Sequence, residues 1–435
     1  MTTSYEKGSL SLFDAVAMGT GVMIGAGILA LTGQIAEMAG ALFPLAFAAG
    51  ALVTAFSAYS YIKVASAHPS AGGIGMILHR AYGRTTVAAG AAVLMALSMV
   101  INESLVARTF GTYALRAFGV ATDSVFVPLL GVALILFAWG VNVSGNRSVG
   151  LLSIVLAVIK IGGIALFGVA GLWASGLSFE ASGGDAGAGG FLAAVALSIL
   201  AFKGFTTITN SGGEITEPHR IVARAIVISI AICVAVYLLV AFAIGSSLPL
   251  ERIVAAKDYA LAEAAEPALG QTGFFLTVAL ALVATASGLV ASMFAVSRML
   301  AMLTDMEMIP HRHFGMPGTV KDHTLVYTVV VAAALTVLFD LSRIASLGAF
   351  FYLVMDILVH WGVYRHVRRE VGARGWVLLT AIGLDAVVLG AFGWLKLRSD
   401  PAIVAIAVAT MAAVFVFERA FLARNRKVNE HHGDH

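Results

Sequence analysis

Hydrophobic and polar positions along the chain are arranged in long blocks and do not alternate residue by residue. Apolar runs of about 20 residues, the length that crosses the ~30 Å hydrocarbon core of a bilayer as a helix, are separated by charged segments. Strands of a membrane barrel would alternate in polarity over ~10 residues, and these runs do not, so each is predicted to be a transmembrane helix. The twelve runs lie near residues 12–38, 43–66, 85–115, 125–143, 149–174, 190–213, 222–247, 272–302, 324–340, 345–364, 375–395 and 402–421.

The composition agrees with an all-α polytopic membrane protein. Of 435 residues, 60% are hydrophobic and 12% are charged, whereas roughly a quarter of the residues in a soluble domain are charged. The net charge of +3 is too small to indicate nucleic-acid binding. Most Lys and Arg fall on the side of the N-terminus, so both termini are expected in the cytoplasm of a cell-membrane protein. The densest basic group is Arg365, Arg368, Arg369 and Arg374.

Motifs for other functions are missing from the sequence. The single cysteine, Cys233, lies in an apolar run and excludes an intrachain disulfide. The eleven histidines show no metal-ligand spacing on a common helix, and no P-loop or HExxH motif is present. The first apolar run is too long for a cleavable signal peptide. We therefore expect no enzyme activity, no metal and no cofactor.

Two spans carry patterns that disfavour a continuous helix. The first contains GTGVMIGAGIL (19–29), with four glycines, and the sixth contains AFKGFTTITNSGGE (201–214), with glycine, hydroxyl residues and asparagine. They occupy corresponding places five spans apart, and since five is odd, a second copy of a five-helix unit would enter the membrane inverted. Interrupted helices at matching positions of inverted repeats are typical of a transporter's central site.

Unwinding at these two places would free backbone groups for a small zwitterion. Its carboxylate would meet amides near Gly25–Gly27, and its ammonium would meet carbonyls near Met23, Leu200 and Lys203. Phe202 and Phe205 flank the second break and are candidate gate aromatics, with plain packing as the alternative. The predicted substrate-binding residues are Met23, Gly25, Ala26, Gly27, Leu200, Phe202, Lys203 and Gly204.

Four segments resemble the amino acid–polyamine–organocation (APC) permeases, in order and over nearly the whole chain. They are GVMIGAGIL (21–29), HPSAGGIGMILHRAYG (68–83), NSGGEITEPHRIVARAI (210–226) and SRMLAMLTDMEMIP (297–310). The resemblance implies a LeuT-like fold with ten core helices in a 5+5 inverted repeat and helices 1 and 6 discontinuous. The implied parts are a cytoplasmic N-terminus (1–11), the two repeats (12–174 and 190–366), two further helices (375–421) and a cytoplasmic tail (422–435).

One lysine stands in the middle of the fifth span. Lys160 lies in an uncharged run over 148–179, where a charge is costly unless it faces the protein interior and has partners. Within the family, the chain resembles archaeal proton-coupled permeases with a lysine at this place. The resemblance implies that the Lys160 ammonium replaces the sodium ion that sodium-coupled relatives hold between helices 1 and 8, near the Gly21 carbonyl, Ser287 and Thr285. The alternative is a structural lysine that snorkels to an interface.

Further charges inside the spans allow two interpretations each. Glu103 and Lys203 are lone charges of opposite sign and are expected to pair with each other. Alternatively, Glu103 receives a cationic side chain or a proton, and Lys203 receives an acidic group. Asp356 and His360 lie four residues apart on one helix face. They are expected to form either a hydrogen-bonded packing pair or a second proton site. Asp385 lies at a comparable depth in the next span.

Together these patterns predict a secondary active transporter. We expect a proton-coupled, sodium-independent amino-acid permease that works by alternating access. The alternative is an exchanger or importer of cationic amino acids or polyamines, favoured if Glu103 or Asp356 faces the cavity unpaired. The expected partners are an amino acid or organic cation, a proton and the lipid bilayer, with no nucleic acid.

Overall fold

The computed structural model describes residues 8–70, 72–144, 146–176, 178–183, 186–309 and 319–432. Regular structure in these ranges is helical, apart from one isolated parallel bridge between Leu10 and Ile215. Each of the twelve predicted spans coincides with a helix. Eleven of these helices are α1 (Leu12–Ala39), α2 (Phe43–Ala67), α4 (Thr86–Arg116), α5 (Phe126–Val143), α6 (Asn146–Ala174), α9 (Pro218–Ser247), α11 (Ala260–Asp305), α12 (Val320–Leu338), α13 (Leu341–Gly362), α14 (Gly375–Ser399) and α15 (Pro401–His432).

The sixth span and the connections contain shorter elements. The sixth span consists of α7 (Gly187–Phe202), the 3₁₀ turn η2 (Lys203–Phe205) and α8 (Thr206–Asn210). The connecting elements are η1 (Gly40–Leu42), α3 (Gly73–Tyr82), α10 (Leu250–Ala255) and the π-helical turn η3 (Val363–Val367).

Length and apolarity make the long helices able to cross a membrane. Nine helical segments within the described ranges meet this condition, and the first of them, Leu12–Ala67, contains both α1 and α2. Two shorter apolar stretches, Val158–Ala174 and Asp322–Leu338, belong to α6 and α12. Since helices satisfy their own backbone in lipid, the chain is a multi-pass membrane protein.

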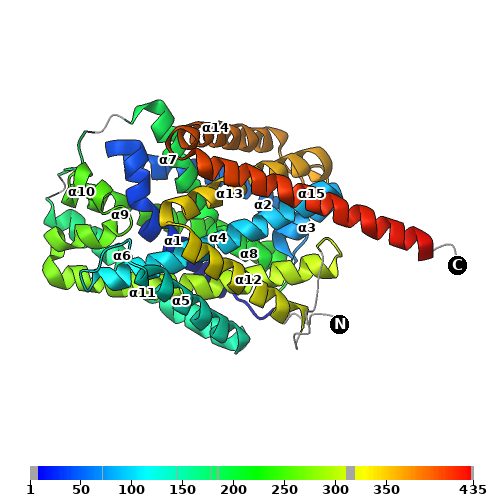
Figure 1. Cartoon of the computed structure of the whole chain (residues 1–435), viewed down its shortest axis with the longest axis horizontal. Helices are drawn as coiled ribbons and strands as arrows, with labels where there is room; N and C mark the ends of the chain where they lie inside the picture. Colours follow the sequence, from blue (N-terminus) through cyan, green and yellow to red (C-terminus); the bar gives the residue numbers. More distant parts are fainter. Residues whose placement is uncertain are drawn as a thin grey trace.

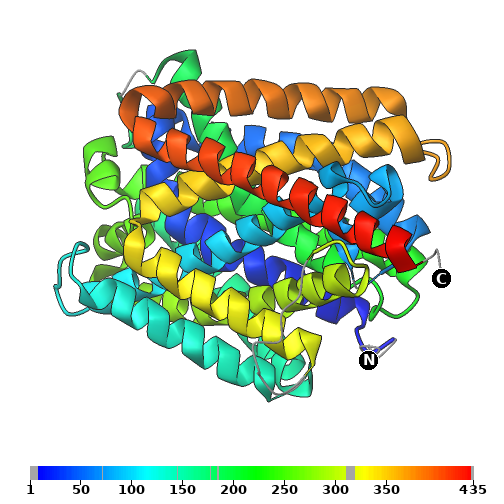
Figure 2. The ribbon, with the colours of Figure 1, turned by 45° about the vertical axis from the view of Figure 1, so that its right-hand side comes forward.

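Helix α1 runs through the middle of the bundle (Figure 1), where it packs against α6, α7, α9 and α11. Helices α14 and α15 lie along one side, and α5 and α12 lie along the other, in both views (Figure 2). These peripheral helices expose large apolar side chains such as Phe137, Val408 and Trp394. A surface of this kind is suited to lipid and not to water.

Local sequence explains where the central helix begins. The Ser11 hydroxyl accepts a hydrogen bond from the Asp14 amide at 3.3 Å, and the Asp14 carboxylate accepts one from the Ser11 amide at 2.8 Å. This reciprocal capping box satisfies two amides at a helix start. Thr319 and Asp322 form the same arrangement at the start of α12.

The predicted break in the first span is not found. Helix α1 is continuous from Leu12 to Ala39. Its glycines instead permit close packing: a Cβ on Gly27 would collide with the Tyr237 hydroxyl and with Ala201. Small residues in membrane helices can either interrupt the helix or allow a neighbouring helix to pack closely. A continuous helix keeps the amides of this segment bonded within the helix.

The predicted break in the sixth span is present, but it is short. Only the 3₁₀ turn Lys203–Phe205 separates α7 from α8. A second interruption occurs where the sequence did not predict one, because α11 extends back to Ala260 across a kink at Gly270, whose φ is 67°. Glycine adopts such a left-handed angle without steric cost. The division of the chain into two inverted repeats stays a prediction.

Candidate substrate and cation sites

Lys160 of α6 connects two other helices inside the bundle. Its ammonium donates a hydrogen bond to the Gly21 carbonyl of α1 at 2.9 Å and another to the Ser287 hydroxyl of α11 at 2.9 Å. The side chain is completely buried. Thr285 makes no such contact, since its hydroxyl donates to the Ala281 carbonyl of its own helix at 2.7 Å. The two contacts tie α1 to α11 at one point.

The chemistry of this contact depends on whether Lys160 carries its proton. Hydrogen bonds from an ionised donor are roughly twice as strong as neutral ones. A protonated Lys160 therefore holds α1 and α11 together more firmly than a neutral one. Gly21 leaves room for the ammonium, because a Cβ at this position would lie 3.2 Å from the Lys160 nitrogen.

The two glycine-rich segments meet directly beside this point. A Cβ on Gly204 of η2 would stand 2.7 Å from the backbone nitrogen of Met23 in α1. Tyr237 of α9 donates to the Met23 carbonyl at 2.6 Å and lies 3.1 Å from the Ala201 carbonyl. Carbonyls on both segments therefore face a side-chain hydroxyl. The sequence analysis missed Tyr237, which looks like one more residue of an apolar span.

The amides predicted to bind a carboxylate are not free in this conformation. Gly25 and Ala26 are described by their backbone alone, which is helical. Within a continuous helix, the amides of residues 25–27 bond to the carbonyls four residues earlier. The Leu200 carbonyl, predicted to meet the substrate ammonium, accepts a hydrogen bond from the Lys203 amide.

The two predicted gate aromatics hold the 3₁₀ turn between neighbouring helices. The Phe202 ring lies 4.8 Å, centroid to centroid, from Tyr237 of α9. The Phe205 ring lies edge-on to Tyr61 of α2 at 5.4 Å. Both phenylalanines are fully buried. Any movement of the break must therefore disturb a contact with a tyrosine on each side.

Glu103 and Lys203 do not form the predicted direct pair. The Lys203 ammonium donates to the Ser98 carbonyl of α4 at 2.6 Å and to the Ser98 hydroxyl at 2.9 Å. One Glu103 oxygen accepts a 3.4 Å hydrogen bond from Ser292 of α11, and the other has no hydrogen-bond partner within the described structure. The two groups therefore have different hydrogen-bond partners, although their charges still interact.

Asp356, His360 and Asp385 converge between α13 and α14. The Nε2 atom of His360 lies 3.4 Å from an Asp356 oxygen and 3.5 Å from an Asp385 oxygen. All three side chains are fully buried. The sequence indicated the Asp356–His360 pair and the similar depth of Asp385, but it did not indicate that the three meet.

A buried ion pair lies at the end of the bundle where α1 begins. The Arg298 guanidinium of α11 and the Glu214 carboxylate make two nitrogen–oxygen contacts of 3.1 Å. Both side chains are almost completely buried. The Glu214 carbonyl accepts a hydrogen bond from the Leu10 amide at 3.0 Å, which joins the segment after α8 to the start of α1. The sequence analysis did not single out this pair.

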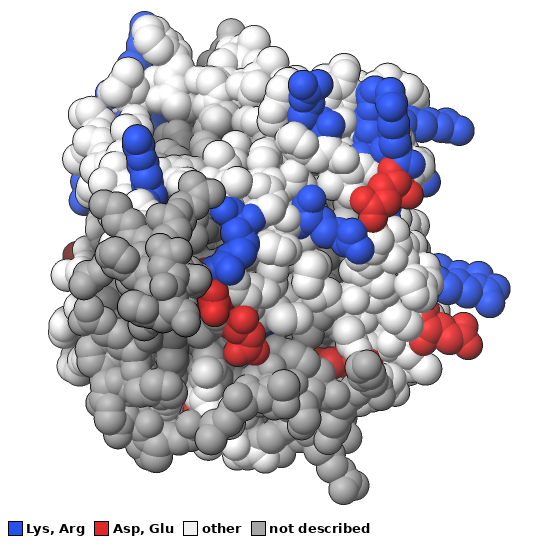
Figure 3. Space-filling model, turned by 90° about the vertical axis from the view of Figure 1, so that its right-hand side faces the viewer, with Lys and Arg blue, Asp and Glu red and all other residues white. Residues whose placement is uncertain are grey.

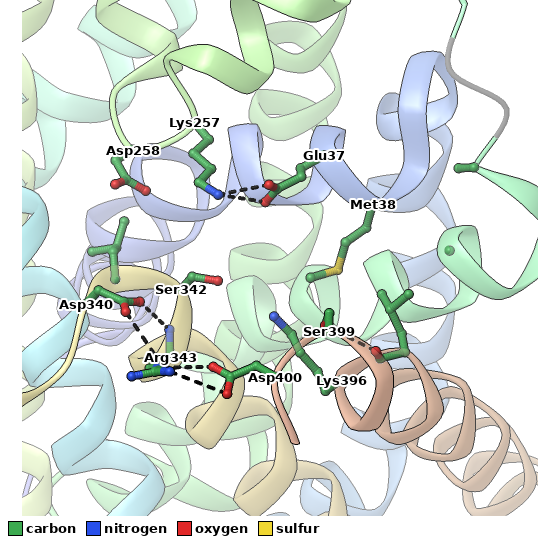
Figure 4. Close-up of a pocket in the computed structure, with 14 residues that line it drawn as sticks. Glu37, Met38, Lys257, Asp258, Asp340, Ser342, Arg343, Lys396, Ser399 and Asp400 are labelled. Atoms are coloured by element: carbon green, nitrogen blue, oxygen red, sulfur yellow. Dashed lines mark hydrogen bonds and ion pairs between the residues drawn. The ribbon is translucent and has the colours of Figure 1, made fainter. Parts of the chain in front are cut away.

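A charged pocket of about 850 Å³ lies at the opposite end, where α1 ends (Figure 4). Lys257 pairs with Glu37 of α1 at 2.9 Å, and Arg343 pairs with Asp400 at 2.7 Å. The remaining charged lining residues are Asp258, Asp340 and Lys396. The first pair joins α1 to the segment before α11, and the second joins α13 to the residue between α14 and α15.

Two carboxyl groups of this pocket, both outside the membrane-spanning helices, have pKa values that shift in opposite directions. Burial raises the pKa of Asp258, although the neighbouring Lys257 opposes the shift. The hydrogen bond from Arg343 holds the pKa of Asp400 below its usual value. Of these two carboxyl groups, Asp258 is therefore the one that acid neutralises more readily.

Comparison with known proteins places these features in a family. The sequence matches the amino acid permease family over residues 10–423. It is 28% identical over 364 residues to the inner membrane transport protein YbaT of Escherichia coli K12. The aligned region covers 82% of this chain and 84% of YbaT. It is 29% identical over 384 residues to the uncharacterized protein MJ0609 of Methanocaldococcus jannaschii, covering 88% and 87%. The serine/threonine exchanger SteT of Bacillus subtilis is 25% identical over 281 residues, 61% of each chain.

Proposed function

The chain belongs to the amino acid permease family, whose members are transporters and not enzymes, and from this premise we propose that it is a proton-coupled, sodium-independent amino-acid permease. The observation that carries the proposal is the Lys160 contact with α1 and α11. An ammonium at this position does what a bound cation would do, which is to link two helices through their oxygen atoms. A lysine gains or loses this positive charge by exchanging a proton, so no sodium ion is needed.

Proton binding is coupled to a change of packing in the proposed mechanism. With Lys160 protonated, the Gly21 and Ser287 oxygens are held by charge-assisted hydrogen bonds and the site stays closed. Loss of the proton weakens both bonds and allows α1 to move away from α11. Coupling requires that a ligand favour one of two discrete arrangements, and the proton is that ligand here.

Substrate binding uses the junction between α1 and η2. We propose that α1 opens at residues 23–27 and frees amides for the carboxylate of an amino acid. Its ammonium then takes the place of the Tyr237 hydroxyl on the Met23 and Ala201 carbonyls. The close approach of Gly204 to Met23 supports this arrangement, since a small movement there opens a space between the two segments.

Ion pairs at the two ends of the bundle are the proposed gates of alternating access. The buried Arg298–Glu214 pair closes one end, and the Lys257–Glu37 pair closes the other. Opening one gate while the other stays closed exposes the central site to one side at a time.

The distribution of basic residues supports cytoplasmic termini. Lys and Arg gather on the described part of the end that carries both termini (Figure 3). The turn between α13 and α14 also lies at this end (Figure 2). It carries the four arginines singled out in the sequence, of which three border a common surface pocket, namely Arg365, Arg368 and Arg369. Positive residues remain on the cytoplasmic side during membrane insertion, so we place this end in the cytoplasm.

A second candidate function rests on Glu103. This carboxylate is buried and makes no ion pair within the described part of the chain. A buried charge without a partner is costly, and the side chain of a cationic amino acid or polyamine would supply that partner. The protein would then be an importer or exchanger of cations.

Uptake into proteoliposomes tests the proposal. We expect at least one neutral amino acid to accumulate in sodium-free buffer under an inward proton gradient, and an uncoupler to abolish the accumulation. Uptake that needs sodium, or that an uncoupler leaves unchanged, would contradict proton coupling. Counterflow of lysine, arginine or putrescine, without uptake of neutral amino acids, would support the cationic candidate.

A further inference from the structure

We propose that Asp356, His360 and Asp385 form a binding site for one divalent transition-metal ion of the Zn²⁺ type. The site lies between α13 and α14, away from the Lys160 contact. It has no part in the proton-coupling mechanism proposed above and stands or falls separately from it.

Two of the three distances between the ligand atoms match those in a zinc site. Ligands at about 2.0–2.1 Å from a tetrahedral zinc ion are separated from one another by roughly 3.3–3.4 Å. The His360 nitrogen lies 3.4 Å from the Asp356 oxygen and 3.5 Å from the Asp385 oxygen. One ligand atom from each of the three residues lies within 4.8 Å of the other two. A small ion therefore reaches all three with little adjustment.

Hydrogen bonding among the three residues does not explain the same arrangement. Within the described structure, His360 Nε2 and both Asp385 oxygens are buried and have no hydrogen-bond partner. A proton shared between such groups draws the two heavy atoms to about 2.5–2.9 Å. Buried polar atoms nearly always have a hydrogen-bond partner. Buried oxygen and nitrogen atoms that face one another without such a bond therefore indicate a ligand bound between them.

Neighbouring hydroxyl groups orient the ligands, as they do in known metal sites. Ser60 of α2 lies 2.7 Å from Nδ1 of His360, the ring nitrogen that does not face the cluster. Ser57 donates to Asp356 at 2.6 Å, and Tyr61 donates to the other Asp356 oxygen. Metal-binding histidines and carboxylates are commonly fixed by such outer hydrogen bonds.

Charge balance also favours a divalent ion. When both carboxyl groups are deprotonated beside a neutral imidazole, the cluster carries two negative charges, and no Lys or Arg among the described residues pairs with Asp356 or Asp385. Unpaired charges are expensive inside a membrane protein. A divalent cation neutralises both carboxylates at once. Imidazole and carboxylate together suit Zn²⁺ better than the hard ions Ca²⁺ and Mg²⁺.

The proposed ion would fix the helices that surround the break in the sixth span. It binds α13 to α14 directly and holds α2 through the serine and tyrosine hydroxyls. Tyr61 also contacts Phe205 of η2. The ion would therefore stiffen the wall against which the short break packs. Because the site is fully buried, the metal must enter as the helices assemble.

Metal analysis of the purified full-length protein tests this proposal. Protein from zinc-supplemented cells should contain close to one zinc per chain, and Asp385→Asn should lower the content at least tenfold. Asp400→Asn, which removes a partly exposed carboxylate that pairs with Arg343 and lies outside the cluster, should keep the wild-type content. Wild-type protein with less than about a tenth of a zinc per chain would overturn the proposal.

A second measurement covers the possibility that Asp385→Asn does not fold. Wild-type protein from zinc-chelated cultures should unfold at a lower temperature than protein from supplemented cultures, and Asp400→Asn should show the same difference. Equal unfolding temperatures in the two preparations would overturn the proposal. Neither readout measures transport, so failure of proton-coupled uptake would leave the metal site standing, and the reverse holds too.

Discussion

Individual buried charges in this protein are stabilised in different ways. Lys160 uses a backbone carbonyl and a hydroxyl from two other helices. Lys203 uses the carbonyl and hydroxyl of Ser98, and Arg298 uses a carboxylate. Only Lys160 joins two other helices to each other through neutral partners, because both partners of Lys203 belong to one residue of α4. This difference is why we assign the proton to Lys160 and not to the other two.

Asp258 gives a residue-scale prediction about stability and pH. Its pKa is raised by burial in the folded protein, above the value of about 3.9 for an unfolded chain. Between these two values the folded state binds more protons than the unfolded state, so stability falls as the pH rises. Asp258→Asn removes this penalty and should raise the unfolding temperature at pH 7 by roughly 1–3 °C.

The pH profile of thermal unfolding in detergent checks the Asp258 prediction. The gain from Asp258→Asn should shrink as the pH falls and should vanish below about 3, where the wild-type carboxyl group is protonated in both states. Asp123→Asn, on an exposed turn, is the matched control and should show no such pH-dependent gain. A variant that is less stable than wild type at pH 7 would contradict the account.

At the scale of helices, hydropathy predicted the spans well because lipid selects for length and apolarity. Glycine content predicted the interruptions less well. Gly27 and Gly204 both stand where another helix approaches too closely for a Cβ, and close packing uses the same small residues as a break does. The sequence alone cannot separate these uses, so it predicted a break in α1 that the structure lacks. The kink at Gly270 lies outside the apolar run and was missed.

The junction between α1 and η2 gives a prediction at this scale. A methyl group on Gly204 would stand 2.7 Å from the Met23 backbone nitrogen, so Gly204→Ala must push α1 away from η2. Overpacking of this kind costs about 1–3 kcal/mol. We expect a lower unfolding temperature and at least a tenfold loss of uptake in proteoliposomes.

The control for this substitution is Gly383→Ala in α14. A Cβ on Gly383 would have no atom within 4 Å, and alanine is the better helix former. This variant should keep wild-type uptake and stability. If Gly204→Ala also kept wild-type uptake and stability, the close approach of α1 and η2 would not be required for transport.

At the scale of the whole molecule, the contacts that matter join residues far apart in the sequence. Lys160 was placed correctly in the interior because a lone charge in a span has few other solutions. The meeting of Asp385 with His360, and the contact of Tyr61 with Asp356, depend on how three helices are rotated about their axes. Apolar spans of this kind contain no signal for that rotation. For the same reason the sequence left open whether Glu103 pairs with Lys203; in the described structure they bond to Ser292 and Ser98 and not to each other.

The closures at the two ends are also properties of the whole molecule. The Arg298–Glu214 pair is fully buried, whereas the Lys257–Glu37 pair is partly exposed to solvent. Exposed ion pairs contribute at most about 1 kcal/mol, and breaking a buried one costs several. In the proposed mechanism we therefore expect the end that holds Lys257 to open more easily than the end that holds Arg298.

The pH dependence of uptake, compared between wild type and Lys160→Ala, tests the central claim most directly. In sodium-free proteoliposomes, wild-type uptake should increase several-fold as the outside is made more acidic. Lys160→Ala should show a flat response while still binding substrate, and Lys63→Ala, a half-buried lysine on α2, should respond as wild type does. An unchanged pH response in folded Lys160→Ala would contradict proton coupling through this lysine.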